Sequence, residues 1–335
     1  MNTQRTTPAD TTSTDTEVFG LAESAGAMPG LRGDDSRVFV LDSQIGGDLD
    51  ELIALWVAAR TIRQLVVVTS DETRGRRAAL ARLVLDELGR PEVPVIAGEE
   101  LDDAETRFVF GDYPLPVVTE SQATPSHVIA ARAEHAPVTV IGLGALTNVA
   151  ELFCVHPHLA ENIDLVIQGG WLDHYRKPRA SHNFHIDQVS TGIVLRMAHR
   201  PRLIFSTYTN DDRLCVTPDS PLVAWFRSSD TGFARLAAEY CDRWFAHRPH
   251  GSWQADSVAV AVALGAPVAE FTTEHVWVAP DARLYRDPNG RPLTVSTAIH
   301  YSAFEDWLSQ VIPEAPLHAH RADSDGDTDG HGAGA

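Results

Sequence analysis

Short apolar runs rich in Val, Ile and Leu alternate with longer segments of helical periodicity along most of this chain. The predicted strands cover residues 38–41, 65–69, 93–97, 138–141, 163–167 and 203–206. The predicted helices cover residues 51–62, 76–88, 126–134, 148–153, 189–199, 232–246 and 257–264. Strands that are apolar throughout are covered on both faces, as in parallel sheets flanked by helices. The fold class is therefore predicted to be α/β, with a mostly parallel central sheet flanked by helices.

The two ends of the chain and its last third follow different patterns. After Phe271 the pattern indicates a C-terminal hairpin, with its turn at Asp287-Pro288-Asn289-Gly290, and then a closing helix over 302–312. Residues 1–34 and 317–335 carry too few large apolar side chains to offset the entropy of ordering, so both are predicted to be disordered tails, the second rich in His, Asp and Gly. No internal repeat divides the remainder, so we expect a single domain over residues 35–316.

Charge and cysteine content exclude several classes of function. Lys and Arg number 27 against 46 Asp and Glu, and the resulting formal net charge of −19 repels nucleic acid polymers and anionic membranes. No apolar run approaches the roughly 20 residues that span a bilayer. The 3 cysteines lack C-x-x-C spacing, and the polar start shows no secretory signal, so a cytoplasmic location is expected.

The densest polar cluster follows the first predicted strand. We call residues 42–51, Asp-Ser-Gln-Ile-Gly-Gly-Asp-Leu-Asp-Glu, the acidic turn. Ligands of open α/β sheets bind outside the carboxyl ends of the strands, which is where this segment is expected. Its carboxylates, Asp42, Asp48, Asp50 and Glu51, repel one another unless a cation or a set of substrate hydroxyls lies between them, and oxygen ligands suit calcium or magnesium. A solvated acidic loop is the alternative.

Three further polar clusters follow later strands or precede a helix. They are Gly144-Ala145-Leu146-Thr147-Asn148, then Gln168-Gly169-Gly170 with Ser181-His182-Asn183 and Asp187, and finally Ala255-Asp256-Ser257. The first and the last have a simple structural explanation when taken alone, because Thr and Asp, as at Thr147 and Asp256, are both common helix N-caps. The glycine-rich turn after residue 141 lacks the Lys-Ser/Thr of a phosphate loop and the spacing of a dinucleotide site.

Together and in this order, the four segments resemble the inosine-uridine-preferring nucleoside hydrolase family, over about residues 38–312. The family's Asp-x-Asp-x-Gly turn and its Asp-Asp pair resemble Asp42-Ser43-Gln44-Ile45-Gly46 and Asp50-Glu51. Its Gly-Pro-Leu-Thr-Asn, Met-Gly-Gly, Glu-Phe-Asn and His-Asp motifs resemble Gly144 to Asn148, Gln168-Gly169-Gly170, Ser181-His182-Asn183 and Ala255-Asp256.

The resemblance implies hydrolysis of the N-glycosidic bond of a ribonucleoside or related N-glycoside by a calcium-bound water. Calcium would be held by Gln44, Glu51, the main-chain carbonyl of Thr147 and Asp256, with Asp42 in support. The sugar pocket would include Asp50 and Asn183, which bind ribose hydroxyls, together with Gln168 and Ser181. Family members are usually dimers or tetramers, so a homo-oligomer is expected on the same ground.

Several departures from the family pattern fall on the chemistry. Gln44 stands where the family has an Asp that binds calcium and acts as general base, and an amide cannot accept the proton of water. Ser181 replaces a ribose-binding Glu, and Ala255 replaces a His implicated in protonating the leaving group. Asp48 is the candidate replacement base, and His182 or His185 the candidate proton donor. The alternative hypothesis is a catalytically impaired or repurposed member that binds a nucleoside or sugar, or processes a nucleoside-like compound without hydrolysis.

Overall fold

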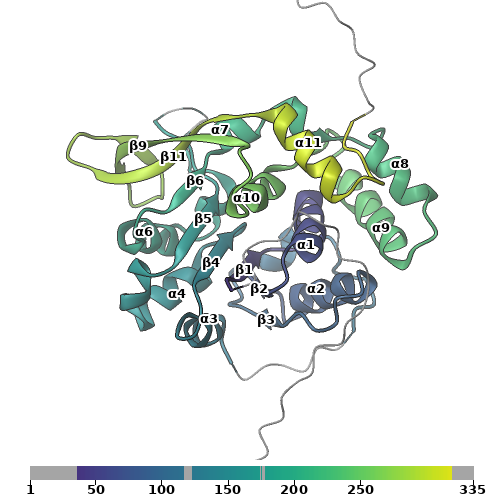
Figure 1. The fold of residues 1–335 in the computed structure, drawn as a ribbon, viewed down its shortest axis with the longest axis horizontal. Coiled ribbons are helices and arrows are strands. Elements are labelled where there is room, and N and C mark those ends of the chain that lie inside the picture. The colour runs from purple at the N-terminus through teal and green to yellow at the C-terminus, as the bar shows by residue number, and fades with distance from the viewer. Residues whose placement is uncertain (1–35, 117–122, 174, 176–177, 319–335) are drawn as a thin grey trace, which may run out of the picture. The chain divides into compact units, whose positions relative to one another are not determined.

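A computed structural model describes residues 36–116, 123–173, 175 and 178–318. Its main feature is a nine-stranded sheet in the order β10-β9-β11-β6-β5-β4-β1-β2-β3 (Figure 1). The strands are β1 (Val38–Ser43), β2 (Leu65–Thr69), β3 (Val95–Ala97), β4 (Val138–Gly142), β5 (Asp164–Gln168), β6 (Arg202–Ile204), β9 (Ala269–Val278), β10 (Leu284–Arg286) and β11 (Arg291–Ile299). β7 (Cys215–Val216) and β8 (Ser252–Trp253) form a separate pair. All neighbours from β3 to β11 are parallel, and β9 is antiparallel to β10 and β11, so the predicted fold class is confirmed.

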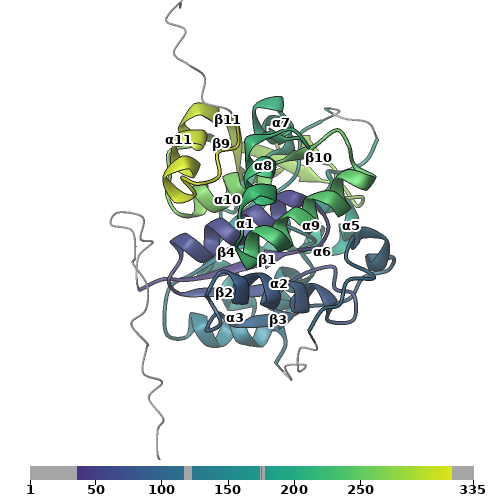
Figure 2. The ribbon, with the colours of Figure 1, turned by 90° about the vertical axis from the view of Figure 1, so that its right-hand side faces the viewer.

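Helices cover both faces of this sheet, as the apolar strands require. The α-helices are α1 (Leu49–Thr61), α2 (Arg76–Glu87), α3 (Pro125–Ala133), α4 (Thr147–Val155), α5 (His182–Ile186), α6 (Gln188–Met197), α7 (Ser206–Thr209), α8 (Pro221–Ser228), α9 (Gly232–His247), α10 (Ala255–Ala263) and α11 (Tyr301–Val311). Single 3-10 turns lie at Ala104–Arg107, Pro157–Glu161 and Asp212–Leu214. α4 packs against α3 and α6, while α1 packs against α2, α9 and α10, and the sheet lies between the two groups (Figure 2).

Most predicted elements lie within a few residues of their observed bounds. The helices α5, α7 and α8 were not predicted, and α7 shortens the strand expected to reach residue 206. Two residues assigned to the C-terminal tail are packed, because Leu317 is buried and His318 Nε2 lies 2.9 Å from the main-chain oxygen of Arg213. The rest of that tail and residues 1–34 lie outside the described residues, and the domain boundaries stay predictions.

The prediction that a turn at Asp287–Gly290 joins two paired strands is wrong. β10 and β11, which this turn connects, do not pair with each other, because both pair with β9 from opposite sides. Arg286 and Arg291 both lie opposite Val276, so the chain crosses over β9 between them. A Cβ on Gly290 would lie 2.4 Å from the carbonyl carbon of Val276, so only glycine fits this crossing. The true hairpin joins β9 to β10.

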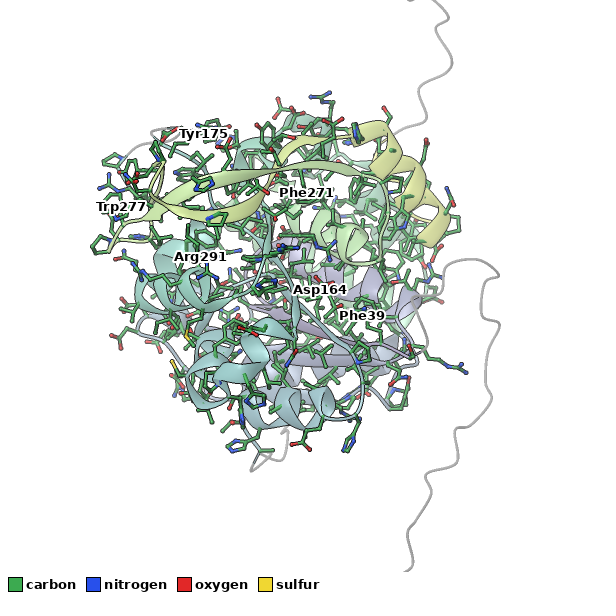
Figure 3. The ribbon with its side chains drawn as sticks, turned by 60° about the vertical axis from the view of Figure 1, so that its left-hand side comes forward. Phe39, Asp164, Tyr175, Phe271, Trp277 and Arg291 are labelled. Carbon is green, nitrogen blue, oxygen red and sulfur yellow. The ribbon has the colours of Figure 1, made fainter. Side chains whose placement is uncertain are left out.

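The outer end of β9 lies far from the centre of the sheet. Trp277 is 49% exposed and lies at the far end of the β9–β11 ribbon, whereas Phe39 on β1 is buried in the sheet (Figure 3). Among the described residues, none of the helices is both long and apolar enough to cross a bilayer.

The strand order reverses direction between β1 and β4. The chain runs from β1 to β3 toward one edge, returns through α3 to β4 on the other side of β1, and continues outward through β5 and β6. Ligands of open α/β sheets bind at the carboxyl ends of the strands beside such a switch point, where the loops diverge. The acidic turn follows β1 and the turn containing Gly144 follows β4, so both lie at this point.

Candidate active site at the switch point

The turns after β1 and β4 are in direct contact. The N–H of Leu143 donates to the main-chain oxygen of Asp42 at 2.8 Å. Gly144 lies so close to the acidic turn that a Cβ there would come within 3.2 Å of Gln44 Oε1 and 2.4 Å of Ser70 Oγ. A larger residue at 144 would therefore displace the Gln44 side chain, which stands at the predicted metal site.

The starts of α1 and α10, some 200 positions apart in the chain, also meet. Asp48 precedes α1, and Asp50 and Glu51 lie in its first turn. The N–H of Asp256, in the first turn of α10, donates to Asp50 Oδ2 at 3.4 Å. Asp256 is not the N-cap of its helix, since Gln254 holds that position, so routine capping does not account for it. The structure thus brings Asp48, Asp50 and Glu51 close enough to the buried carboxylate of Asp256 for their charges to interact with it.

These carboxylates are buried at a considerable electrostatic cost. Burial raises the pKa of Asp42 to about 7, of Asp48 to about 7 and of Glu51 to about 8. Burial, then the charge of Asp256, holds the pKa of Asp50 well above its usual range; burial, then the charge of Glu51, does the same for Asp256. Like charges at low dielectric favour protons or a bound cation.

The oxygen atoms at this site fit the chemistry of a hard divalent cation. Asp42 Oδ2 and Gln44 Oε1 are buried acceptors without a hydrogen-bond donor, while Asn148 Nδ2 donates to Asp42 Oδ1 at 3.0 Å. Within the described part of the chain, no three His, Cys, Asp or Glu side chains are arranged to hold an ion. Two of the predicted ligands are not side chains of these four types, because Gln44 would bind through its amide oxygen and Thr147 through its main-chain oxygen.

Glu51 and Thr147 are held in place by hydrogen bonds to other residues of the polar clusters. Glu51 Oε2 accepts from the N–H of Gly47 at 2.9 Å, so the carboxylate folds back over the acidic turn. Thr147 begins α4 without capping it, and its hydroxyl donates to Asp187 Oδ2 at 2.8 Å. Asp187 in turn caps α6, so the Thr147 side chain ties α4 to α6.

The predicted sugar-binding residues lie together after β5. Asn183 Nδ2 donates to Gln168 Oε1 at 2.7 Å and to the main-chain oxygen of Leu143 at 2.9 Å. Ser181 Oγ accepts from the N–H of Gly170 at 2.6 Å. The amide hydrogens of Asn183 are therefore used within the protein, which leaves its Oδ1 and the hydroxyl hydrogen of Ser181 for a ligand.

The charged groups that act on His182 of α5 are Arg107, Arg179, Asp71 and His185. His182 is exposed, yet protein atoms crowd its ring, and this desolvation together with the positive charges of Arg107 and Arg179 lowers its pKa. His182 is therefore neutral at neutral pH, which makes it a poor acid without substrate present. His185 Nδ1 lies 3.1 Å from Gln188 Nε2.

Two residues that hold the acidic turn were not predicted. Arg77 of α2 is fully buried, donates to the main-chain oxygen of Ile45 at 3.0 Å and of Gln44, and pairs with Asp71 at 3.2 Å. Tyr240 of α9 is equally buried and contacts the turn through its hydroxyl. Arg77 could have been found, because it occupies the same helical face as buried Leu80 and Val84, where a charge is unusual.

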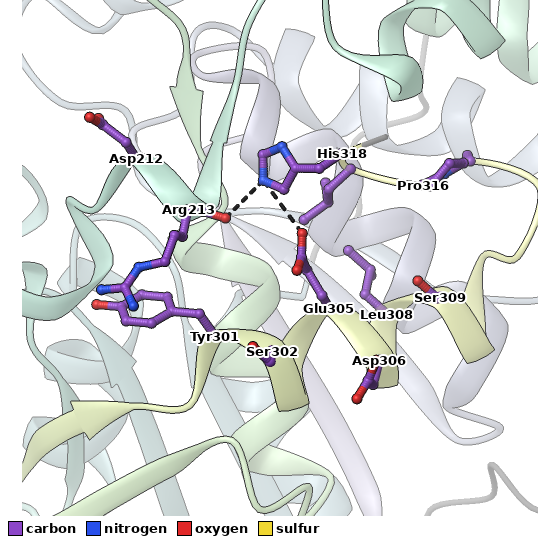
Figure 4. A pocket seen from close by; sticks show the side chains of 12 residues that line it. Asp212, Arg213, Tyr301, Ser302, Glu305, Asp306, Leu308, Ser309, Pro316 and His318 are labelled. Carbon is purple, nitrogen blue, oxygen red and sulfur yellow. Dashed lines mark hydrogen bonds and ion pairs between the residues drawn. The ribbon is translucent and has the colours of Figure 1, made fainter. Parts of the chain in front are cut away.

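One cavity lies elsewhere and has little of this chemistry. Its volume is about 530 Å³, and it is lined by Arg213, Tyr301, Glu305 and His318 among others (Figure 4). Arg213 stacks over Tyr301 at 3.8 Å and pairs with Asp211 at 2.8 Å, and His318 lies 3.7 Å from Glu305. Because these charged groups are partnered and none belongs to the four sequence clusters, the switch point remains the candidate site.

Comparison with known proteins agrees with the geometry. The chain is 29% identical over 185 residues to the pyrimidine-specific ribonucleoside hydrolase RihA of Shewanella woodyi, an alignment covering 48% of this chain and 57% of that protein. The chain thus spans little more than half the length of this curated relative.

Solved structures share the fold. A purine-preferring ribonucleoside hydrolase from Gardnerella vaginalis has a TM-score of 0.69 at 17% identity, with 83% of this chain and 99% of that chain covered. An inosine-uridine preferring nucleoside hydrolase from Bacillus anthracis has a TM-score of 0.66 at 16% identity, with the same coverage. The model of the inosine-uridine preferring nucleoside hydrolase family matches residues 39–303, and the chain belongs to this family.

Proposed function

We propose that the protein is an N-glycosidase that hydrolyses a ribonucleoside or related N-glycoside with the help of one calcium ion. Two observations carry the proposal: Asp50 of the acidic turn meets Asp256, and two acceptors of the same turn, Asp42 Oδ2 and Gln44 Oε1, are buried without a donor. A cation and a sugar with free hydroxyls would together satisfy this set of oxygens. A bound calcium ion would polarise the attacking water and hold the ribose hydroxyls.

The proposed ligands are oxygens of Gln44, Glu51, Asp256 and the carbonyl of Thr147, with Asp42 oriented by Asn148. Asp50 and Asn183 Oδ1 would accept hydrogen bonds from ribose hydroxyls, and Ser181 and Gln168 would line the far side of the ring. These contacts would hold the sugar while positive charge develops at its anomeric carbon.

The reaction adds water across the bond between the anomeric carbon and the base nitrogen. The water oxygen bonds to the carbon, its proton passes to a carboxylate, and the bonding pair of the broken bond leaves with the base, which takes up a proton. Gln44 cannot accept that proton, so we assign it to Asp48, whose pKa of about 7 suits a base near neutral pH. His182 is the proposed donor to the base.

A repurposed member that binds but does not hydrolyse is the second candidate. It is favoured by the Gln44 amide, whose Oε1 is buried without a donor and cannot take a proton, and by the hydrogen bond from Ser252 that Asp48 already accepts. In that case the site would bind a nucleoside or sugar without releasing the base.

A panel of ribonucleosides with and without calcium separates the two candidates. We expect base release that depends on calcium, with uridine and cytidine tested first because the similar RihA protein is described as pyrimidine-specific. In Gln44→Asp, a restored carboxylate should raise the rate by about 10²–10⁴-fold, the range for a general base. Calcium binding and nucleoside binding without base release in either protein would establish the second candidate.

Partners and location belong to the same proposal. The expected partners are a small-molecule nucleoside and a second copy of the chain, in a dimer or tetramer, within the cytoplasm. Light scattering of the purified protein measures the oligomeric state directly.

A further inference from the structure

The hydroxyl of Tyr240 bridges the two ends of the glycine segment within the acidic turn. It accepts from the N–H of Gly46 at 2.7 Å and donates to the main-chain oxygen of Asp48 at 2.9 Å, and Glu51 Oε2 lies 3.3 Å away. Tyr240 is separated from these residues by about 190 positions in the chain and has no exposed surface. One side-chain atom thus satisfies main-chain groups on both sides of Gly47.

The surroundings leave the Tyr240 hydroxyl little freedom to move. The Phe110 ring packs edge-on against the Tyr240 ring, with centroids 4.8 Å apart. On the other side of the turn, the Phe108 ring fills the space that a Cβ on Gly46 would occupy, and Gly46 has a φ of 98°. The turn is therefore held between an aromatic ring and a buried hydroxyl. Burial, then the charge of Glu51, raises the pKa of Tyr240 well above its usual range, so the hydroxyl stays protonated.

This contact matters because Asp48, Asp50 and Glu51 all leave the turn within one helical turn of Gly47. Glycines at 46 and 47 give the main chain no conformational preference of its own, so the direction of these carboxylates depends on contacts from outside the turn. Arg77 holds the carbonyl of Ile45 at 3.0 Å on the N-terminal side. Tyr240 supplies the corresponding restraint on the C-terminal side, where the carboxylates begin.

We propose that Tyr240 is a positioning residue of the candidate active site, whose hydroxyl fixes the main chain of the acidic turn so that its carboxylates face Asp256. The part of this inference that concerns calcium rests on the proposed function. The part that concerns the turn does not, because the hydrogen bonds to Gly46 and Asp48 exist without any ligand.

The test compares Tyr240→Phe with Tyr301→Phe in the full-length protein. Each variant loses one hydroxyl that donates to a main-chain oxygen. Tyr301 lies on α11, outside the candidate site, and its hydroxyl donates to the main-chain oxygen of Tyr208 at 2.7 Å. Amide hydrogen exchange and ¹H–¹⁵N spectra report on the turn without calcium, calorimetry measures the calcium dissociation constant, and thermal unfolding monitors global stability.

In Tyr240→Phe we expect the amides of Gly46 to Glu51 to exchange about tenfold faster and the calcium dissociation constant to rise about tenfold, the factor for one buried hydrogen bond. Tyr301→Phe should lower the Tm by less, because Tyr301 is half-buried and its hydroxyl donates to a single main-chain oxygen, and should leave both local measurements within twofold of the parent. Unchanged turn exchange in Tyr240→Phe would overturn the inference.

Measurements on the parent protein cover two further cases. If Tyr240→Phe does not fold, the Gly46 amide of the parent still tests the inference, and exchange within tenfold of an unstructured peptide overturns it. If the parent binds no calcium, the calcium proposal fails, while the exchange comparison continues to decide the role of Tyr240.

Discussion

The stability of the calcium-free protein should fall as pH rises from 5 to 8. Asp42, Asp48, Asp50, Glu51 and Asp256 all have a raised pKa in the folded state, chiefly because they are buried. The folded state therefore binds more protons than the unfolded state between about pH 4 and pH 8. A carboxyl with a raised pKa is neutral at low pH and must become a buried charge as the pH rises, so stability is lost in this direction.

The magnitude follows from the same values. The rise of the Asp42 pKa from 3.8 to about 7 corresponds to about 4 kcal/mol once the carboxyl is ionised. Neighbouring acids share this cost, because ionisation of one opposes ionisation of the next. A total loss of about 4–8 kcal/mol between pH 5 and 8 is comparable to the whole stability of many domains, so the effect on the Tm should be large.

Thermal unfolding in a chelator, at several pH values, measures this effect. Saturating calcium should remove most of the pH dependence, because the ion neutralises the ionised carboxylates. Asp256→Asn is the matched control: without one buried charge, it should be more stable than the parent at pH 8 in chelator and should gain little from calcium. A Tm that stays level or increases from pH 5 to 8 in chelator would refute the electrostatic reasoning.

Two other substitutions test the contacts that support the site and the sheet. Arg77→Met removes a buried guanidinium and leaves the carbonyls of Gln44 and Ile45 without donors, so chemical denaturation should show a loss of about 3 kcal/mol and calorimetry weaker calcium binding. Arg107 also pairs with Asp71, at 2.6 Å, and equal stability of the variant would show that this ion pair alone compensates the Asp71 charge. Gly290→Ala places a Cβ 2.4 Å from Val276 and should lower the free energy of unfolding by more than about 2 kcal/mol through this steric overlap. Gly265→Ala is strained only by its φ of 80°, because no atom lies within 4 Å of the new Cβ, and should cost about 1 kcal/mol. Equal effects of the two glycine substitutions would mean that β9 gives way to the methyl group.

The central half of the sheet could be predicted from the sequence because its strands carry one consistent signal. Val40, Val68 and Val140 lie on neighbouring strands with almost no exposed surface, which is why the runs around them are apolar without alternation. The edge did not follow this rule. Most residues of β9 are exposed or half-buried, so its sequence is not a continuous apolar run. β10 and β11 lie on opposite sides of β9 because the chain crosses over it, and this crossing depends on contact between Gly290 and Val276, which no local sequence pattern indicates.

The same distinction applies to the candidate site. The acids of the acidic turn were identifiable because they follow a strand at the edge of the sheet where ligands bind. Asp256 precedes a helix and was identified only through the resemblance of Ala255-Asp256 to the family's His-Asp motif. Tyr240 and Arg77 were not identified, because each lies on a helix face that otherwise packs in the core. Both hold the acidic turn through main-chain atoms, those of Gly46 and Asp48 for Tyr240 and those of Gln44 and Ile45 for Arg77. Main-chain acceptors leave no chemical trace in a sequence. The hydrogen bond from the Asn183 amide to Gln168 was not predicted either, because both residues were expected to bind the ligand and not each other.

The nine-stranded sheet ends on both sides in strands of only three residues, β3 and β10. So short an edge exposes few free amide and carbonyl groups, and Arg286 adds a charge to one of them, so a neighbouring molecule gains little by extending the sheet. If two copies associate, their contact must therefore be made by helices or loops, and the strand edges would stay solvated even in a concentrated solution, which protects the protein from forming fibrils.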